Sequence, residues 1–292
     1  MSPITLRRII LSFGFALLLF QELRADPIPV GPGRLEFPNG DETITLFTYK
    51  PPTYQDGPVL FIFHGVERNA EGYRNFAITL AERFGVIVVA PLFDKERFPF
   101  LRYQRGGVVD ADGKVQPEAK WTYAIVPRIV TFVRGLENRP TLPYYLVGHS
   151  AGGQFLVRLA AFLPNEAVRI VAGNPGSHLF PNREDKFGYG FGALPAELCS
   201  DEVIRRYLAA PVTFYLGTGD ILSNHSLDVS PAAMRQGPNR LTRGRACFAA
   251  AQQLATDRGW VCNWRKVETP GIGHEAPFMF AAKEIADALF GK

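Results

Sequence analysis

One short segment of the sequence combines a potential nucleophile with a backbone that could expose it. Gly148–Gly153 reads Gly-His-Ser-Ala-Gly-Gly, and it lies between an apolar run and a stretch whose apolar residues have helical spacing. This is the G-x-S-x-G pattern, in which a serine occupies a tight strand-to-helix turn that needs small neighbours. A serine there lies at the positive end of the helix dipole, which favours developing negative charge. We predict that Ser150 is the nucleophile of an acyl-transfer reaction.

A serine hydroxyl becomes a good nucleophile only when a base takes its proton, and that base is commonly a histidine oriented by a carboxylate. His274 follows the last predicted strand and precedes the terminal helix. The chain order that accompanies this motif is nucleophile, acid, histidine, so we predict that His274 is the base. The other histidines lie in the elbow, at the end of an earlier strand or in loop-rich stretches: His149, His64, His178 and His225.

The acid is expected between the nucleophile and the base, directly after a strand. Asp220 stands in that position after the strand predicted at Val212–Leu216, and we predict that it is the acid. Asp228 is the alternative, while Asp201 lies further from any predicted strand end. Asn174 follows the preceding strand, where the acid is also often found, but its amide is not acidic. Asp220 could instead be a turn residue, since aspartate is common in turns.

An acyl-transfer site also needs N–H donors for the tetrahedral oxyanion. The backbone N–H of Ala151, directly after the nucleophile, is the first predicted donor. The second comes from the loop after the strand at Val59–Phe63, where Gly65 permits close approach and Val66 is our predicted donor. Residues 67–69, Glu-Arg-Asn, could fix this loop through side-chain bonds or could be a solvated helix start with Asn69 as its N-cap.

Several elements are required to bring these residues together. Short β-branched and aromatic runs predict strands, and apolar stripes at helical spacing predict helices between them. Near-continuous apolar runs are typical of parallel strands covered on both faces, so we predict an α/β fold with a mostly parallel central sheet flanked by helices on both faces. The strands are predicted at Thr43–Tyr49, Val59–Phe63, Val86–Ala90, Tyr144–Val147, Arg169–Ala172, Val212–Leu216 and Trp264–Glu268, and the helical stripes at residues 73–84, 125–136, 155–163 and 278–289.

Two stretches interrupt this alternation, and a third carries candidate substrate-binding residues. Residues 175–210 and 221–243 are rich in Gly, Pro and Asn and are too long for ordinary connections, so we predict loop-rich insertions over a site. The third stretch follows the strand at Val86–Ala90 and carries aromatic residues that could line a substrate pocket or pack in the core: Phe93, Phe98, Phe100, Tyr103 and Trp121. It also carries arginines that could hold an acidic substrate or belong to a solvated loop: Arg97, Arg102 and Arg105.

The N-terminus has the pattern of an export signal. Arg7 and Arg8 precede an apolar run, Ile9–Phe20, and a polar segment ends in Ala25. The run is shorter than the roughly 20 apolar residues needed to span a bilayer. We predict a signal peptide at residues 1–25, a single domain at residues 26–292 and a secreted or periplasmic location. Cleavage would leave 29 basic and 27 acidic side chains, because residues 1–25 hold three of the 32 basic and one of the 28 acidic residues.

Composition excludes several classes. With 47% hydrophobic and 21% charged residues, the 292-residue chain is neither disordered nor fibrous. The small, unclustered basic excess argues against nucleic-acid binding. Cys199, Cys247 and Cys262 lack the spacing of a zinc site, and in an oxidising compartment a disulfide and free thiols are equally compatible with them. We expect no metal, no cofactor and no membrane contact after cleavage, and either a monomer or a small homo-oligomer.

The sequence resembles the α/β-hydrolase superfamily across nearly the whole mature chain. The features that carry this resemblance are the His64-Gly65 strand end, the Gly148–Gly152 elbow, Asp220, and His274 with its terminal helix. Within this superfamily the chain resembles secreted polyhydroxybutyrate depolymerases and feruloyl esterases. This narrower resemblance rests on the predicted export and on the His-Gly-x-x-Arg-Asn loop at residues 64–69. The resemblance implies a serine esterase that acts through an acyl-enzyme on small or oligomeric esters. A peptidase on the same triad, or a binding protein that kept the fold, is the alternative.

Overall fold

The computed structural model describes residues 26–223 and 226–291; the predicted signal peptide and His225 lie outside the described residues. The described residues form an eight-stranded sheet in the order β1-β2-β4-β3-β5-β6-β7-β8. The first two strands pair antiparallel, β2 pairs antiparallel with β4, and the strands from β4 to β8 are parallel. The bounds are β1 (Gly31–Asn39), β2 (Glu42–Lys50), β3 (Val59–Phe63), β4 (Ile87–Pro91), β5 (Tyr144–His149), β6 (Arg169–Gly173), β7 (Val212–Gly217) and β8 (Arg265–Thr269).

The predicted strands are confirmed to within one or two residues, but β1 was not predicted. It contains Pro32 and Pro38, and proline ordinarily signals the absence of a strand. Because β1 pairs only with β2 and forms an edge of the sheet, a missing N–H can face solvent there.

Helices cover both faces of the sheet, as predicted. The buried strand β3 shows why, since Leu60 and Ile62 pack on one side while Phe61 and Phe63 pack on the other. The side of Leu60 is covered by α1 (Ala70–Phe76), α2 (Ile78–Phe84), α10 (Ala276–Ala281) and α11 (Ile285–Phe290). The side of Phe61 is covered by α4 (Ile125–Leu136), α5 (Ala151–Phe162), α7 (Asp201–Ala209) and α9 (Arg240–Arg258). Two predicted stripes are each divided, into α1 with α2 and into α10 with α11.

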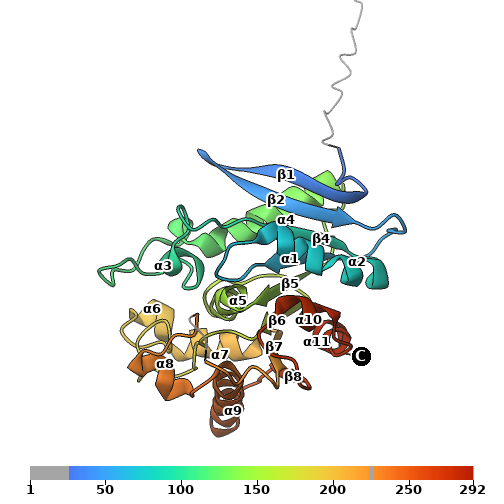
Figure 1. Cartoon of the computed structure of the whole chain (residues 1–292). Helices are drawn as coiled ribbons and strands as arrows, with labels where there is room; N and C mark the ends of the chain where they lie inside the picture. Colours follow the sequence, from blue (N-terminus) through green and yellow to red (C-terminus); the bar gives the residue numbers. More distant parts are fainter. Residues whose placement is uncertain (1–25, 224–225, 292) are drawn as a thin grey trace, which may run out of the picture.

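The two predicted insertions and the stretch after β4 lie together on one side of the molecule. The stretch after β4 carries α3 (Phe100–Tyr103) and two short 3-10 turns, Glu118–Lys120 and Thr122–Ala124. Residues 175–210 are loop up to α6 (Ala196–Cys199) and α7, and residues 221–243 contain α8 (Pro231–Gln236) and the start of α9. Figure 1 shows α3, α6 and α8 on the same side of α5. Across residues 26–223 and 226–291, the helices all lack the combination of length and hydropathy needed to cross a membrane.

Candidate active site

Ser150 occupies a strained turn between β5 and α5. Its φ of 56° and ψ of −115° lie in a region that residues other than glycine rarely adopt, and such strain is typical of a nucleophile elbow. The turn is held by a hydrogen bond of 2.8 Å from the Ser150 N–H to the Gly173 carbonyl. A side chain at Gly152 would collide with the carbonyl oxygen of Phe63, so glycine is what allows α5 to start this close to β3.

Three predicted residues from distant segments form one hydrogen-bonded chain. His274 Nε2 lies 3.0 Å from Ser150 Oγ, and His274 Nδ1 lies 2.7 Å from Asp220 Oδ2. Asp220 and Ser150 are buried, and the His274 side chain keeps 19% of its surface exposed. An imidazole placed between a carboxylate and a hydroxyl in this way can accept the serine proton while the carboxylate stabilises the resulting imidazolium.

Arg240, at the start of α9, contacts the second carboxylate oxygen of Asp220. Its Nη1 lies 3.4 Å from Asp220 Oδ1, and both side chains are almost fully buried. The same guanidinium donates from Nη2 to Ser226 Oγ at 3.0 Å. With one oxygen toward His274 and the other toward Arg240, the carboxylate is held in a single orientation. No pattern in the sequence indicates this pairing of Arg240 with Asp220.

The loop after β3 is held in place through the carbonyl of Gly65. The Gly65 carbonyl accepts the Arg68 N–H at 3.2 Å and lies 3.0 Å from His64 Nδ1. His64 Nε2 accepts the Phe93 N–H at 3.1 Å, which places the ring proton on Nδ1. In a planar trans peptide the C=O and the following N–H point in opposite directions. Fixing the Gly65 carbonyl therefore directs the Val66 N–H away from these donors.

His64 acts in this loop as a neutral group. Burial is the main effect that lowers the pKa of His64 to about 3, well below the pH at which histidine ordinarily titrates. Its ring stacks on Tyr103 with a centroid distance of 4.8 Å, and the Tyr103 hydroxyl donates to the His64 carbonyl at 2.9 Å. Sequence reasoning noted His64 only as a strand end and missed this bracing role.

A tyrosine on α1 joins this loop to the elbow. The Tyr73 hydroxyl lies 3.1 Å from His149 Nδ1 and accepts a backbone hydrogen bond from Gly65. Its own proton is thus available to His149, the residue directly before the nucleophile. Burial, together with the nearby His274 and Arg240, keeps the pKa of His149 well below the usual value, so His149 is neutral. One hydroxyl therefore ties the predicted oxyanion loop to the predicted nucleophile segment.

Asn174 ties the base loop to the end of β7. Its Nδ2 donates to the Gly273 carbonyl at 2.9 Å, and its Oδ1 accepts the Gly217 N–H at 2.8 Å. The side chain is buried and the backbone φ is 41°. Asn174 thus occupies the alternative acid position with a neutral group that positions the segments carrying Asp220 and His274.

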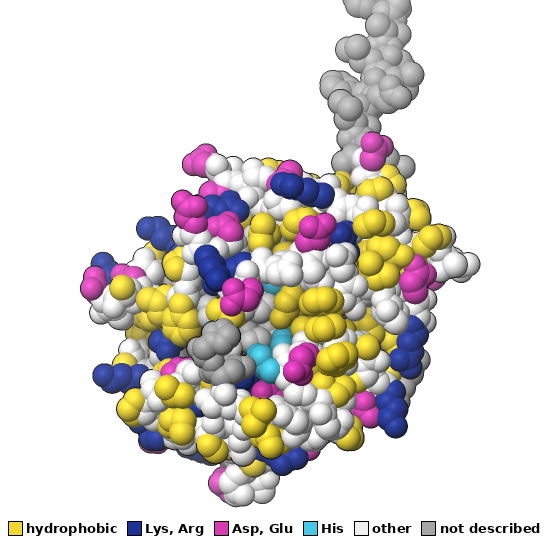
Figure 2. Space-filling view, in the orientation of Figure 1, with side chains coloured by type: hydrophobic (Ala, Val, Ile, Leu, Met, Phe, Trp, Pro, Cys, Tyr) yellow, Lys and Arg dark blue, Asp and Glu magenta, His cyan; other side chains and the backbone are white. Residues whose placement is uncertain are grey.

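These elements surround a pocket of about 320 Å³, lined by Gly65, Val66, Glu67, Asn69, Tyr73, His149, Ser150, Ser226, His274 and Ala276. Figure 2 shows histidine side chains at the centre of this face, between acidic and hydrophobic side chains. Ala151, the first residue of α5, has an N–H without an intrahelical acceptor. The pocket therefore brings the predicted nucleophile and base beside Val66, the predicted second donor, while Ala151 begins α5 directly after Ser150.

No family model matches the chain, and no curated protein matches it. Solved structures do match. The poly(3-hydroxybutyrate) depolymerase LpqC from Bordetella parapertussis is 36% identical with a TM-score of 0.82, covering 90% of this chain and 91% of that one. Poly(aspartic acid) hydrolase-1 from Sphingomonas sp. KT-1 is 30% identical with a TM-score of 0.82, covering 91% of this chain and all of that one.

The chain belongs to the α/β-hydrolase superfamily. The siderophore hydrolase EstB from Aspergillus nidulans, at 17% identity and a TM-score of 0.51 over 91% of this chain and 96% of that one, shares the fold. The eight-stranded, mostly parallel sheet of the described residues matches these α/β-hydrolases, which confirms the predicted fold class.

The other predicted acids of this α/β-hydrolase are occupied elsewhere. Asp228 bonds the Tyr189 hydroxyl and the Ser230 N–H, and Asp201 pairs on the surface with Arg183 and Arg258. Neither bonds His274, whose carboxylate partner is Asp220.

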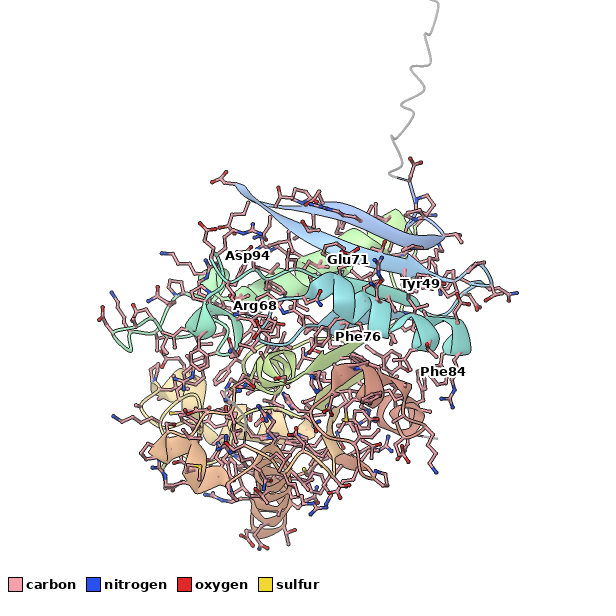
Figure 3. All side chains as sticks on the ribbon, viewed as in Figure 1. Tyr49, Arg68, Glu71, Phe76, Phe84 and Asp94 are labelled. Atoms are coloured by element: carbon pink, nitrogen blue, oxygen red, sulfur yellow. The ribbon has the colours of Figure 1, made fainter. Side chains whose placement is uncertain are left out.

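Both interpretations of residues 67–69 hold. Asn69 caps α1, accepting the Gly72 N–H at 2.9 Å. Arg68 is buried, donates to the Phe98 carbonyl at 2.9 Å and lies over the ring of Tyr103. Figure 3 shows Arg68 between α1 and the α3 segment.

The aromatic residues after β4 divide between core and surface. Phe93, Phe98 and Tyr103 are fully buried and pack against Phe155 of α5 or against each other. They form core rather than pocket wall. Trp121 lines a separate cavity of about 500 Å³ beside α4, and Phe100 is 44% exposed.

The three cysteines are free, and Cys247 lies inside α9. Within the described part of the chain, no group of three or more His, Cys, Asp or Glu residues is placed to hold a metal ion.

Proposed function

We propose that this α/β-hydrolase is an exported serine esterase that cleaves carboxylic esters through an acyl-enzyme. The observation that carries the proposal is the continuous hydrogen-bonded chain from Asp220 through His274 to Ser150, opening into a pocket beside the Ala151 and Val66 N–H groups. Its relatives include a protein described as a poly(3-hydroxybutyrate) depolymerase, and that polymer is linked by esters.

In the proposed reaction Ser150 Oγ attacks the ester carbonyl carbon while His274 Nε2 takes the hydroxyl proton. Asp220 stabilises the imidazolium, and the Ala151 and Val66 N–H groups donate to the oxyanion. The tetrahedral intermediate collapses, His274 returns the proton to the leaving alcohol, and an acyl-serine remains. Water, deprotonated by His274, then attacks the acyl-serine and releases the carboxylic acid.

Amide hydrolysis is the second candidate. It is favoured by the similarity to a protein described as a poly(aspartic acid) hydrolase, because the linkages of that polymer are amides. Comparing 4-nitrophenyl esters with peptide anilides separates the two. Cleavage of anilides alone would overturn the ester proposal.

Labelling by a fluorophosphonate probe tests the nucleophile. We expect the wild type to be labelled and Ser150→Ala to lose both labelling and ester turnover. Ser200→Ala is the matched control, because Ser200 caps α7 away from the pocket. Labelling that persists in Ser150→Ala would exclude the proposed mechanism.

Export is part of the proposal and has its own test. If residues 1–25 are a signal peptide, the mature protein recovered from the periplasm or the medium begins at Asp26. N-terminal sequencing decides this, and a processed protein found only in the cytoplasm would contradict it.

A further inference from the structure

Arg158 carries a buried positive charge without a carboxylate among its hydrogen-bond partners. It lies on α5 and is 1% exposed. Its guanidinium donates to the Gln154 carbonyl at 2.9 Å, to Ser177 Oγ at 3.0 Å and to the Gly188 carbonyl. Its Nε is buried without a partner. Buried charges are normally paired with an opposite charge, so this arrangement leaves a local excess of positive charge.

A second arginine lies on the other side of the same glycine. Gly188 has a φ of 104°, and a side chain there would collide with the guanidinium of Arg105. The Arg105 guanidinium carbon lies 4.9 Å from the ring centre of Phe100 and 5.1 Å from that of Tyr189. Arg105 is half-buried, its Nε has no partner, and within the described residues it forms no ion pair. Among the residues that the structure describes, neither of these two neighbouring cations forms an ion pair with a carboxylate.

The other arginines of this stretch differ from Arg105. Arg97 pairs with Asp94 at 2.6 Å, and Arg102 donates to the Arg97 carbonyl at 2.9 Å and lies over the Phe98 ring. Of the three arginines considered from the sequence, Arg105 is the one whose guanidinium contacts two rings, those of Phe100 and Tyr189, and it forms no ion pair within the described residues. A guanidinium oriented by flanking rings is well suited to bind a planar carboxylate.

Contacts along the insertions connect this region to the pocket. The Tyr189 hydroxyl bonds Asp228, which lies two residues after Ser226, a residue of the pocket wall. Arg158 lies eight residues after Ser150, which corresponds to about 12 Å along an α-helix. Because Arg105 and Arg158 both contact Gly188, a carboxylate bound at Arg105 would be remote from the scissile carbonyl, by a separation on the order of that helix length.

We propose that Arg105, with Arg158 behind it, forms a subsite for a carboxylate of the substrate, so that the preferred ester carries an acidic group remote from the scissile bond. This inference deepens the proposed esterase function and rests on it. An oligomer of hydroxy acids fits the requirement, because its free end is a carboxylate several bonds from the ester being cleaved.

Two matched series of esters test the subsite. The first is the mono-4-nitrophenyl esters of dicarboxylic acids from succinate to dodecanedioate, and the second is the neutral 4-nitrophenyl esters of the same chain lengths. We expect the ratio of kcat/KM, charged over neutral, to rise at the longer lengths in the wild type at low salt. In Arg105→Gln this ratio should fall by about 3- to 10-fold, as expected for a partly exposed ion pair with good geometry. Arg102→Gln should retain it.

A ratio that does not vary with length in the wild type, or one unchanged in Arg105→Gln, would overturn the subsite. A binding measurement separates this failure from failure of the esterase proposal. Sebacate is titrated calorimetrically into Ser150→Ala and into the double variant Ser150→Ala/Arg105→Gln. If Ser150→Ala binds sebacate and the double variant does not, the subsite is supported even if the wild type hydrolyses no ester. If the wild type hydrolyses esters but shows no charge preference, and Ser150→Ala does not bind sebacate, the subsite is refuted and the esterase proposal stands.

Discussion

Removing the Tyr73 hydroxyl tests how the oxyanion loop is positioned. Tyr73→Phe keeps the ring, which packs edge-on against Phe280 at 6.1 Å, and deletes the group that joins Gly65 to His149. The change leaves one buried N–H and one buried ring nitrogen without a partner, and each unsatisfied group costs about 1–3 kcal/mol. Phenylalanine is itself easier to bury than tyrosine and offsets part of this cost. We expect the free energy of unfolding to fall by about 2 kcal/mol.

The effect on ester hydrolysis should exceed the effect on substrate binding. If the Val66 N–H is displaced by up to about 1 Å, the rate should fall by about 10- to 100-fold. We therefore expect kcat to fall by this factor while KM changes little. A boronic acid that mimics the tetrahedral intermediate should lose affinity by a similar factor, because it uses the same N–H groups. Steady-state kinetics on 4-nitrophenyl butyrate and inhibition by the boronic acid give the two numbers.

Tyr144→Phe is the matched control for this prediction. Tyr144 is also buried, and its hydroxyl accepts the Glu166 N–H at 3.0 Å, but it begins β5 at the end opposite Ser150. Its loss should lower stability by a comparable amount and leave kcat near the wild-type value. If folded Tyr73→Phe keeps kcat within about twofold of the wild type, or loses kcat no more than Tyr144→Phe does, the hydroxyl does not position the loop.

Two substitutions and a change of pH test the packing around the glycines and the burial of neutral histidines. Gly152→Ala should destabilise the chain by at least about 2 kcal/mol in urea unfolding, because the added methyl meets the Phe63 carbonyl, and unchanged stability would contradict the proposed close approach. Gly135→Ala should stabilise it by about 0.5–1 kcal/mol, because Gly135 is an exposed helix residue with nothing within 4 Å of an added Cβ; a loss of stability would count against that geometry. Burial lowers the pKa of His64 and of His178 to about 3 in the folded chain, whereas a histidine of the unfolded chain has a pKa of about 6.5. Between these two pH values the unfolded chain therefore binds protons at these histidines and the folded chain does not. The stability present above pH 6.5 should then be lost as the pH falls toward 3, by about 1.4 kcal/mol per pH unit for each histidine, and a constant free energy of unfolding between pH 7 and pH 4 would refute this.

Much of the fold could be predicted because its signals are local. Five of the parallel strands, β3 to β7, are near-continuous apolar runs that need burial on both faces; together with shorter β-branched and aromatic runs, these signals located seven of the eight strands found in the described residues. The exception, β1, has its core contacts on one face and carries prolines that only an edge position tolerates.

The predicted nucleophile, acid and base could be located for a related reason. Ser150 is marked by a contiguous motif whose small residues serve a turn, and the others lie after strands whose carboxyl ends must meet at one edge of a parallel sheet. Topology thus brings Asp220 and His274 together although 54 residues separate them. Their meeting in one hydrogen-bonded chain follows from where the strands end, so it could be inferred without knowing any side-chain contact.

The groups that hold these residues could not be inferred in this way. Arg240 faces Asp220 from the start of a helix that belongs to an insertion, and the path of an insertion is not determined by the order of strands. The positions of Asn174 and His64 at strand ends could be predicted from the sequence. Their hydrogen-bond partners could not, because a residue at a strand end can bond any of several neighbouring loops. Such contacts depend on burial, where an unpaired polar group is costly and each partner must be supplied by a particular neighbour. The same reasoning gives Arg158 its significance. Arg158 is a fully buried cation with no carboxylate among its described hydrogen-bond partners, and the half-exposed Arg105 beside it is the point at which a substrate could supply a negative charge.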